Sequence, residues 1–287
     1  MITIAVLGMG AMGSRVAARL LAAGYRVQGW NRSPAPLEAL RQAGGRAAET
    51  PRRAVAGADI VLSVLRDDDA SRVVWSDDDA GALAGLAAGA LVLECSTLTP
   101  AWIAALAGRV SAHEAMLLDA PMVGSRPQAE AGELVFLVGG EASGVSRAIP
   151  LFECLGRAHH HVGGLGHGTA LKLAVNALFA AQVAQMAELL QFLGRSGLDG
   201  ARALEVMQEL PVTSPAAAAA GSQILREQFA PLFPIPLVAK DLSYAAAAAQ
   251  RSGTGLPLSE AAATLFRRAE RSGLDGLNIT GIARLVF

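Results

Sequence analysis

The chain of 287 residues contains few cysteines and a small fraction of charged residues. Its only cysteines, Cys95 and Cys154, belong to no metal-binding or redox spacing, which favours a reducing, cytoplasmic compartment. Charged residues make up 17% of the chain and the formal net charge is −1, so nucleic acid and anionic membranes are not expected partners. No uncharged apolar run reaches the roughly 20 residues of a membrane helix, and the first apolar run lacks the basic segment of a signal peptide.

Hydrophobic residues, by contrast, make up 52% of the chain, while aromatic residues make up only 5%. Such a chain builds its core mainly from alanine, leucine and valine, and its composition is not that of a disordered protein. A length of 287 residues is more than a single core ordinarily needs. We therefore expect two domains.

The strongest local pattern is a glycine-rich turn between an apolar run and a helix-forming stretch. Residues 2–7 are typical of a strand buried on both faces, and residues 15–23 of a helix. Between them lies the glycine loop, which we define as residues 8–13 and which consists of Gly8, Met9, Gly10, Ala11, Met12 and Gly13. A G-x-G-x-x-G pattern between strand and helix is typical of dinucleotide binding, with the pyrophosphate at the helix N-terminus. A purely structural glycine turn is the alternative.

The second strand, predicted over residues 26–30, ends in a segment that bears on the choice of cofactor. In dinucleotide-binding folds, an acid at this point accepts hydrogen bonds from the adenosine ribose and selects NAD. Here Asn31 is neutral, Arg32 offers a guanidinium for a 2′-phosphate, and Ser33 offers a hydroxyl. The segment favours NADP(H) over NAD(H), and a solvated turn is the alternative.

Strands and helices alternate over residues 1–162, which predicts a doubly wound, mostly parallel sheet. We expect further strands over residues 58–65, 90–94, 115–119, 134–138 and 158–162, with the last members antiparallel, and helices over residues 34–43 and 51–56. A glycine-rich hinge, residues 163–168, follows. Nothing breaks a helix over residues 169–193, so one long helix, about residues 168–194, should link the first domain to an all-α second domain, residues 163–287.

Two runs of aspartate, residues 67–69 and 77–79, do not predict a metal site. Consecutive acids do not converge on one ion, whereas an acidic run suits the positive N-terminus of a helix. We expect the first run to begin a helix and the second to lie in a solvated loop. Thr99 or Ser96 is expected to cap the helix that begins at Pro100.

Among the candidate acid–base residues, one lysine is more convincing than the histidines. Residues 159–161 are consecutive histidines on a predicted strand, so they point to opposite faces and suit a solvated strand end. His167 lies in the hinge, where it either contacts substrate or simply occupies the loop. Lys172 is set among apolar residues of the long helix, with Asn176 one turn later on the same face. Such a lysine can transfer protons, and the alternative is a lysine that snorkels at a helix start.

A second lysine, Lys240, precedes Asp241, which we expect to begin a helix over residues 242–250. Alone, this pair predicts nothing further.

Taken in order, these motifs resemble those of the β-hydroxyacid dehydrogenase family, the relatives of 3-hydroxyisobutyrate dehydrogenase, over nearly the whole chain. GMGAMG at residues 8–13 and NRS at 31–33 resemble the cofactor motifs of NADP-preferring members. ECST at 94–97 is close to D-x-S-T, DAPMVGS at 119–125 to the substrate loop D-A-P-V-S-G-G, and GHGTALKLAVN at 166–176 to G-x-G-x-x-x-K-x-x-x-N. KD at 240–241 also matches.

The resemblance implies a Rossmann-type N-terminal domain, an all-α C-terminal domain, and reversible hydride transfer between NADP(H) and a small carbonyl or hydroxy acid such as succinic semialdehyde or glyoxylate. It implies that Lys172 is the catalytic acid–base residue, with Asn176 beside it. It implies a cofactor site formed by Gly8, Met9, Gly10, Ala11, Met12, Gly13, Asn31, Arg32, Ser33, Leu65, Arg66, Thr97 and Lys240. It implies a substrate site formed by Met122, Val123, Gly124, Ser125, Lys172 and Asn176.

Two residues depart from the family pattern. Val123 stands where the family has a serine that binds the substrate carboxylate. Ser125, Arg126 and the backbone N–H groups of residues 124 and 125 are candidate replacements, unless the substrate is less acidic or bulkier. Arg66 stands where the family usually has proline, and it either adds positive charge near the cofactor or only changes the loop.

Two other interpretations remain open. An imine reductase on the same fold is one, although members specialised for that chemistry usually lack the lysine. A non-catalytic dehydrogenase-like module is the other, and the retained Lys172, Asn176 and Lys240 count against it. The alanine- and leucine-rich second domain favours a homodimer or homotetramer.

Overall fold

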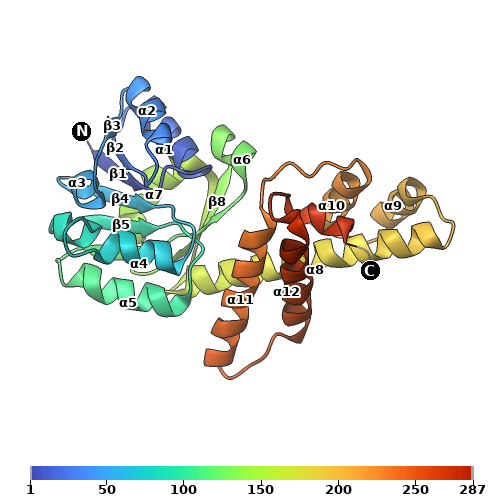
Figure 1. Ribbon diagram of the computed structural model, residues 1–287. Helices are drawn as coiled ribbons and strands as arrows, with labels where there is room; N and C mark the ends of the chain where they lie inside the picture. The colour runs from blue at the N-terminus through green and yellow to red at the C-terminus, as the bar shows by residue number, and fades with distance from the viewer. Residues whose placement is uncertain (1, 286–287) are drawn as a thin grey trace. The chain divides into compact units, whose positions relative to one another are not determined.

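A computed structural model of the protein describes residues 2–285. The chain divides into two compact units, which we call unit 1, Met1–Lys172, and unit 2, Leu173–Phe287. Figure 1 shows that unit 1 combines strands and helices, whereas unit 2 is helical. Unit 1 includes the first residues of the long helix, which the sequence assigned to the second domain.

Unit 1 is built on one sheet with the strand order β3-β2-β1-β4-β5-β6-β8-β7, and β9 pairs with β8. The strands β1 to β6 pair in parallel, β8 runs antiparallel to β6 and β7, and β9 runs parallel to β8. The predicted mostly parallel sheet with antiparallel last members is therefore confirmed. The strands are β1 Thr3–Leu7, β2 Arg26–Trp30, β3 Arg46–Ala47, β4 Ile60–Ser63, β5 Leu91–Glu94, β6 Met116–Asp119, β7 Met122–Val123, β8 Leu134–Gly139 and β9 Gly156–Gly163.

Helices cover both faces of this sheet because alternate strand residues point to opposite sides. Ile4 and Val6 of β1 belong to a core that includes residues of α1, α2, α6 and α7. Ala5 and Leu7 of the same strand belong to a second core, formed with α3, α4 and α5. These helices are α1 Gly13–Ala22, α2 Ala35–Gln42, α3 Pro51–Val55, α4 Asp68–Ser76, α5 Pro100–Ser111, α6 Arg126–Ala131 and α7 Ala142–Leu155, with a 3₁₀ turn η1 at Ala82–Gly85.

Several boundaries in unit 1 differ from those predicted. The strand expected over residues 58–65 is β4, which is limited to Ile60–Ser63 because the chain turns away from the sheet at the loop that faces Gly8. The two-residue strands β3 and β7 and the helices α6 and α7 were not predicted. Strands of two residues carry no detectable periodicity, and Pro150 lies inside α7, where proline is a helix-breaking signal.

Unit 2 is organised around α8, His167–Arg195, whose 29 residues confirm the predicted long helix. Buried residues of α8 such as Leu173, Ala180 and Val183 form a core with the helices α11 and α12. A smaller core joins Met186 and Leu190 to the helices α9 and α10. The helices of this unit are α9 Gly200–Glu209, α10 Pro215–Leu225, α11 Ile235–Arg251, α12 Pro257–Ala269, η2 Glu270–Leu274 and η3 Ile279–Arg284.

Within residues 2–285, α8 is the one helix that is long and apolar enough to cross a membrane, by length and composition alone. Half of its most apolar window is buried inside the protein. Because the core helix of a soluble protein passes the same test, this finding is weak evidence for a membrane span.

The helix expected over residues 242–250 begins earlier than predicted. It is α11, which starts at Ile235, so Lys240 and Asp241 lie inside the helix instead of before it. Pro236 is the second residue of this helix. Proline is tolerated in the first turn of a helix, where its missing N–H has no intrahelical partner.

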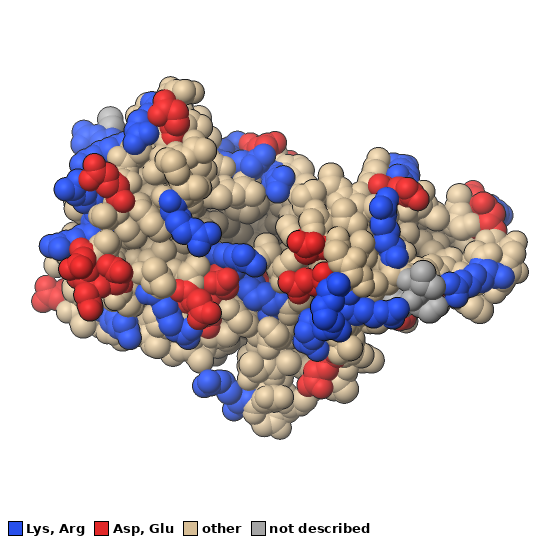
Figure 2. Space-filling view, viewed as in Figure 1, with Lys and Arg blue, Asp and Glu red and all other residues tan. Residues whose placement is uncertain are grey.

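The surface of unit 1 shows no large area of one charge on the face drawn in Figure 2, where blue and red side chains are interspersed. This mixture agrees with the formal net charge of −1.

Candidate active site

The glycine loop joins β1 to α1 with no intervening residues beyond the loop itself. Gly8 adopts a φ of +92°, and a Cβ there would meet the backbone oxygen of Val64. A Cβ on Gly13 would meet the backbone oxygen of Gly8, so the start of α1 packs directly on the turn. A Cβ on Gly10 would have nothing within 4 Å. The loop is therefore closed on the protein side and open at Gly10, where a phosphate group can approach the backbone. These residues fit the pyrophosphate of a dinucleotide.

The segment after β2 is tied to the glycine loop through Asn31. The backbone N–H of Met9 donates to Asn31 Oδ1 (3.0 Å), and Asn31 Nδ2 donates to the backbone oxygen (3.0 Å) and the hydroxyl (2.8 Å) of Ser33. Asn31 therefore fixes the conformation of residues 31–33 and holds them against the glycine loop. Arg32 is exposed and, within residues 2–285, makes no hydrogen bond or ion pair. Its guanidinium is available to an anionic group.

A buried polar cluster connects the loops that follow β4 and β5. The backbone N–H of Leu65 donates to Ser96 Oγ (2.7 Å), and the backbone N–H of Ser96 donates to Glu94 Oε1 (3.1 Å). Glu94 is fully buried, and its second oxygen accepts a hydrogen bond from Trp75 Nε1 (3.3 Å). Burial raises the pKa of Glu94 to about 7, and the hydrogen bonds from the serines and Trp75 oppose that rise.

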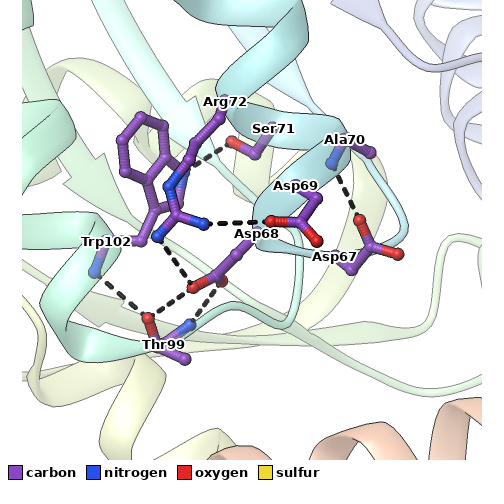
Figure 3. A network of polar contacts seen from close by, with 8 residues as sticks. All are labelled: Asp67, Asp68, Asp69, Ala70, Ser71, Arg72, Thr99 and Trp102. Carbon is purple, nitrogen blue, oxygen red and sulfur yellow. Dashed lines mark hydrogen bonds and ion pairs between the residues drawn. The ribbon is translucent and has the colours of Figure 1, made fainter.

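The same two loops are joined a second time through Asp68 and Thr99. Asp68 is buried, and its carboxylate accepts hydrogen bonds from the backbone N–H (2.9 Å) and hydroxyl (2.6 Å) of Thr99. Thr99 Oγ1 in turn caps α5 by accepting from the backbone N–H of Trp102 (3.1 Å). Arg72 lies over the Trp102 ring and pairs with Asp68 and Asp69 (Figure 3). We call Asp68 and Thr99 the α4–α5 latch.

The hydrogen bonds at the starts of α4 and α5 test the roles expected of the capping residues and of the two aspartate runs. Asp67 caps α4 through Ala70, which confirms that the first run begins a helix. Asp77 ends α4, and residues 77–79 are exposed, which confirms a solvated loop. Thr99 caps α5, whereas Ser96 holds Leu65.

The substrate loop expected after β6 contains β7. Met122 pairs with Phe136 and Val123 with Val135 of β8. Gly124 has a φ of +128°, and α6 begins at Arg126. Val123 is half-buried, and Arg126, also half-buried, makes no hydrogen bond or ion pair within the described residues.

The expected catalytic pair lies on consecutive turns of α8. Lys172 and Asn176 are each only 8% exposed. Asn176 Nδ2 donates to Asp241 Oδ2 (2.6 Å), and the other oxygen of Asp241 lies 2.9 Å from Lys240 Nζ. Because a carboxylate accepts only from the NH₂ side of an amide, Asp241 fixes the orientation of Asn176 and leaves its Oδ1 as an acceptor. The Lys240 ammonium also lies 4.8 Å from the centre of the Tyr244 ring.

The histidines lie apart from these contacts. His159 stacks on Phe152, and His161 Nε2 lies near the backbone oxygens of Gly140 (2.9 Å) and Gly163 (3.0 Å). His167 is exposed at the start of α8.

Sequence reasoning missed the parts played by three buried acids. Glu94 and Asp119 were treated only as the first letters of motifs, and Asp241 as a helix start. For Glu94 and Asp119, the available signal was an acid at the end of an otherwise apolar strand, because a charge there is buried and requires partners.

Comparison with known proteins agrees with this geometry. Residues 3–164 match the family model described as the NAD binding domain of 6-phosphogluconate dehydrogenase. Residues 166–286 match the model described as the NAD-binding domain of NADP-dependent 3-hydroxyisobutyrate dehydrogenase. The protein belongs to the β-hydroxyacid dehydrogenase family.

Similar family members act on different acids. The chain is 35% identical to the NAD-dependent L-serine dehydrogenase of Pseudomonas aeruginosa, covering 98% of this chain and 97% of that protein. It is 34% identical to the 3-hydroxyisobutyrate dehydrogenase of the same organism, covering 99% of both. The solved 3-hydroxyisobutyrate dehydrogenase of Mycobacterium tuberculosis with L-serine has a TM-score of 0.90, is 27% identical, and is covered to 98% by 99% of this chain.

This β-hydroxyacid dehydrogenase is therefore an oxidoreductase of hydroxy acids that uses a nicotinamide cofactor. The two family-model descriptions and the relatives include both NAD and NADP proteins, so the cofactor's 2′-substituent is a separate question.

Proposed function

We propose that the protein interconverts a small hydroxy acid and its aldehyde or keto acid with NADP(H), and that Lys172 transfers the proton. The supporting observation is the distribution of cations. Only two of the 24 Lys and Arg residues are lysines, and these are Lys172 and Lys240. Every other cation is arginine, which does not deprotonate in proteins. A buried lysine in a chain that otherwise uses arginine is explained by a need for a group that gives up its proton.

The chemistry divides between the cofactor and the chain. A bound nicotinamide supplies or takes up the hydride. Lys172 Nζ donates a proton to the carbonyl oxygen in reduction and accepts the hydroxyl proton in oxidation. Asn176 Oδ1 accepts a hydrogen bond from the Lys172 ammonium or from the substrate hydroxyl, because Asp241 engages the other side of its amide. The remaining task of the chain is to align the reacting carbon atoms and exclude water.

The cofactor would be held by the residues expected from the sequence. The glycine loop would receive the pyrophosphate, Leu65, Arg66 and Thr97 would follow it along the carboxyl edge of the sheet, and Lys240 would contribute from α11. The unpaired guanidinium of Arg32 supports NADP(H), because a 2′-phosphate supplies the anion that it lacks.

The substrate's carboxylate would be held without the family serine. Val123 has no hydrogen-bond donor in its side chain, whereas Arg126 begins the next helix three residues later and has no partner among the described residues. We infer that Arg126 binds the carboxylate, assisted by Ser125 and the backbone at Gly124. Met122 and Val123 would then form the apolar wall of the substrate site.

Two further proposals concern the state of the protein in the cell. We infer a cytoplasmic homodimer or homotetramer. The side chains of Leu178 and Phe192 on α8 are each 62% exposed, and such apolar residues favour association between copies. Sedimentation analysis measures the oligomeric state directly.

The decisive experiment is a substrate panel assayed with both cofactors. Oxidation of NADPH and of NADH is measured with glyoxylate, succinic semialdehyde and cyclic imines, and reduction of NADP⁺ and of NAD⁺ with 3-hydroxyisobutyrate and L-serine. We expect turnover of at least one carbonyl or hydroxy acid and a loss of roughly 10²- to 10⁴-fold in kcat for both Lys172→Ala and Lys172→Arg. Because the arginine variant keeps the charge, its inactivity separates proton transfer from electrostatic binding. If Lys172→Ala turned over substrate at the wild-type rate, the proposed role of Lys172 would be refuted. If imines were the best substrates, C=N reduction would replace the proposed interconversion of hydroxy and carbonyl acids.

The panel also tests Arg126. Arg126→Ala should raise KM for acids by roughly tenfold or more, with a smaller change in kcat. An unchanged KM would transfer the role to Ser125 or the backbone.

A further inference from the structure

Asp119 connects the substrate loop to the helix that carries Lys172. It is the last residue of β6, directly before the substrate loop, and its side chain is fully buried. Asp119 Oδ1 accepts a hydrogen bond from the backbone N–H of Gly166 (2.7 Å), and Oδ2 from that of Thr169 (2.6 Å). These N–H groups lie just before and within the first turn of α8. One carboxylate therefore fixes the start of the helix.

The packing around Asp119 leaves the start of α8 little freedom. A Cβ on Gly139 would meet Asp119 Oδ1, and a Cβ on Gly168 would meet the backbone oxygen of Leu137. The first turn of α8 thus lies against the backbone of β8, with the carboxylate between them. Burial raises the pKa of Asp119, and the hydrogen bonds from Gly166 and Thr169 oppose that rise. Both oxygens act as acceptors, which suits the ionised form.

Lys172 lies three residues beyond Thr169, or about 4.5 Å along the helix axis. Side chains at this spacing share a face, and helical side chains lean toward the N-terminus, where Asp119 is bound. A buried cation near the positive end of a helix is otherwise unfavourable. The Asp119 carboxylate is bound to the backbone at the start of this same helix.

We propose that Asp119 is a positioning residue for proton transfer: it holds Lys172 in place relative to the substrate loop and, as an anion at the helix start, favours the ammonium form of the lysine. This inference rests on the proposed function, in which Lys172 transfers the proton. As a consequence, Lys172 is protonated at neutral pH and can donate the proton that reduction needs. Oxidation needs the deprotonated lysine and therefore requires a higher pH.

Some other titratable groups of the described residues belong to this part of α8 or are bonded to it. His167 lies at the helix start and is exposed. On α11, Asp241 binds Asn176 on the next turn and pairs with Lys240. Among these groups, Asp119 is the one that binds the first turn of α8. The experiment therefore removes the charge of Asp119.

The test compares Asp119→Asn with Asp59→Asn in the full-length protein with NADP(H). Asp59 also accepts a backbone hydrogen bond, from Thr3 (2.8 Å), but lies at the start of β4, the opposite end of the strand from the site. We expect Asp119→Asn to lower kcat on the order of ten- to hundredfold and to move the pH limb of oxidation assigned to Lys172 about 1 unit lower. Asp59→Asn should change neither. A loss of kcat with an unmoved limb would reduce Asp119 to a structural residue and overturn the charge assignment.

A second measurement needs no variant of Asp119 to fold and no turnover. Because the chain has two lysines, ¹³C-labelled lysine gives two side-chain Cε signals, which Lys240→Arg assigns. In the wild type, the Lys172 signal should titrate within about 1 unit of the ordinary lysine value near 10.4, despite its burial. A midpoint more than about 2 units lower would overturn the proposal. If the panel finds no substrate but the Lys172 midpoint is about 1 unit lower in Asp119→Asn than in the wild type, the proposed function fails and the Asp119–Lys172 coupling stands.

Discussion

At the scale of single residues, the chain combines an arginine-rich surface with a few buried ionisable groups. Each of the groups Lys172, Asp241, Asp119 and Glu94 is at most 8% exposed. Ionisable groups buried in this way are expensive unless they are paired, and they concentrate where chemistry is done. Lys172 was predictable because a charge amid apolar residues stands out. The contacts of Asp119 with the start of α8 and of Asp241 with Asn176 were not, since these partners lie tens of residues away along the chain.

Glu94 gives a prediction on stability and pH. Its pKa is raised from 4.5 to about 7, so the folded protein binds an extra proton between these values. The stability contributed by the protonated group is complete below about pH 4.5 and is lost as the pH rises through about 7. Relative to the wild type, Glu94→Gln should therefore gain about 3 kcal/mol in free energy of unfolding between pH 4.5 and pH 8, whatever its absolute stability.

Urea unfolding of both proteins at several pH values measures this difference. The exposed Glu141→Gln controls for the general loss of a carboxylate. A gap between wild type and Glu94→Gln that is the same at pH 5 and pH 8 would show that Glu94 does not titrate in this range.

At the scale of elements, long helices and strands with a clear hydrophobic pattern were predicted well. Short elements, and elements whose bounds depend on neighbouring residues, were not. α8 was predicted because 25 residues without a breaker leave no other structure. The start of α11 was wrong because proline marks both a break and a first helical turn, and only the neighbouring residues decide which. The two-residue strands β3 and β7 exist because their neighbours β2 and β8 pair with them, which no local pattern records.

The α4–α5 latch gives a prediction at this scale, because it joins the two loops that carry Leu65, Arg66 and Thr97. Asp68→Ala removes the buried carboxylate that accepts from Thr99 and leaves the N–H and hydroxyl of Thr99, a half-buried residue, without this acceptor. We expect a loss of about 2–4 kcal/mol in free energy of unfolding and weaker NADPH binding. Asp69→Ala is the matched control, because Asp69 is 94% exposed and, among residues 2–285, forms an ion pair only with Arg72. It should cost less than about 0.5 kcal/mol.

Urea unfolding and NADPH titration by fluorescence measure both effects. Equal losses for the two variants would mean that the latch contributes no more than an exposed ion pair. A loss of stability without any loss of affinity would separate the latch from the cofactor site.

At the scale of the whole molecule, the two units divide the proposed work unequally. Unit 1 carries the glycine loop, the segment after β2, the loops after β4 and β5 and Lys172, whereas unit 2 carries Asn176, Asp241 and Lys240. The fold class of each unit was predictable from the change in pattern at the hinge. The substrate was not, because Val123 removes the residue by which the family pattern would have indicated it.

Cofactor binding should raise the free energy of unfolding of the whole protein. Arg32 should determine how much more NADPH raises it than NADH does. A ligand that binds only the folded state at 100 times its Kd stabilises it by about 2.7 kcal/mol. If Arg32 binds the 2′-phosphate, Arg32→Ala lowers the affinity for NADPH by roughly tenfold or more. The same NADPH concentration then stabilises the folded state by about 1.4 kcal/mol or less. NADH lacks the phosphate, so its stabilisation should not change.

Urea unfolding with and without each cofactor measures all four values, and Arg41→Ala is the matched control. Arg41 is an exposed arginine on the next helix that pairs with Glu38 (3.2 Å), so its removal should leave both cofactors unaffected. Because each comparison is made within one variant, any effect of the mutation on folding itself cancels. Equal weakening of NADPH and NADH by Arg32→Ala would reject the 2′-phosphate contact and leave the segment as a solvated turn.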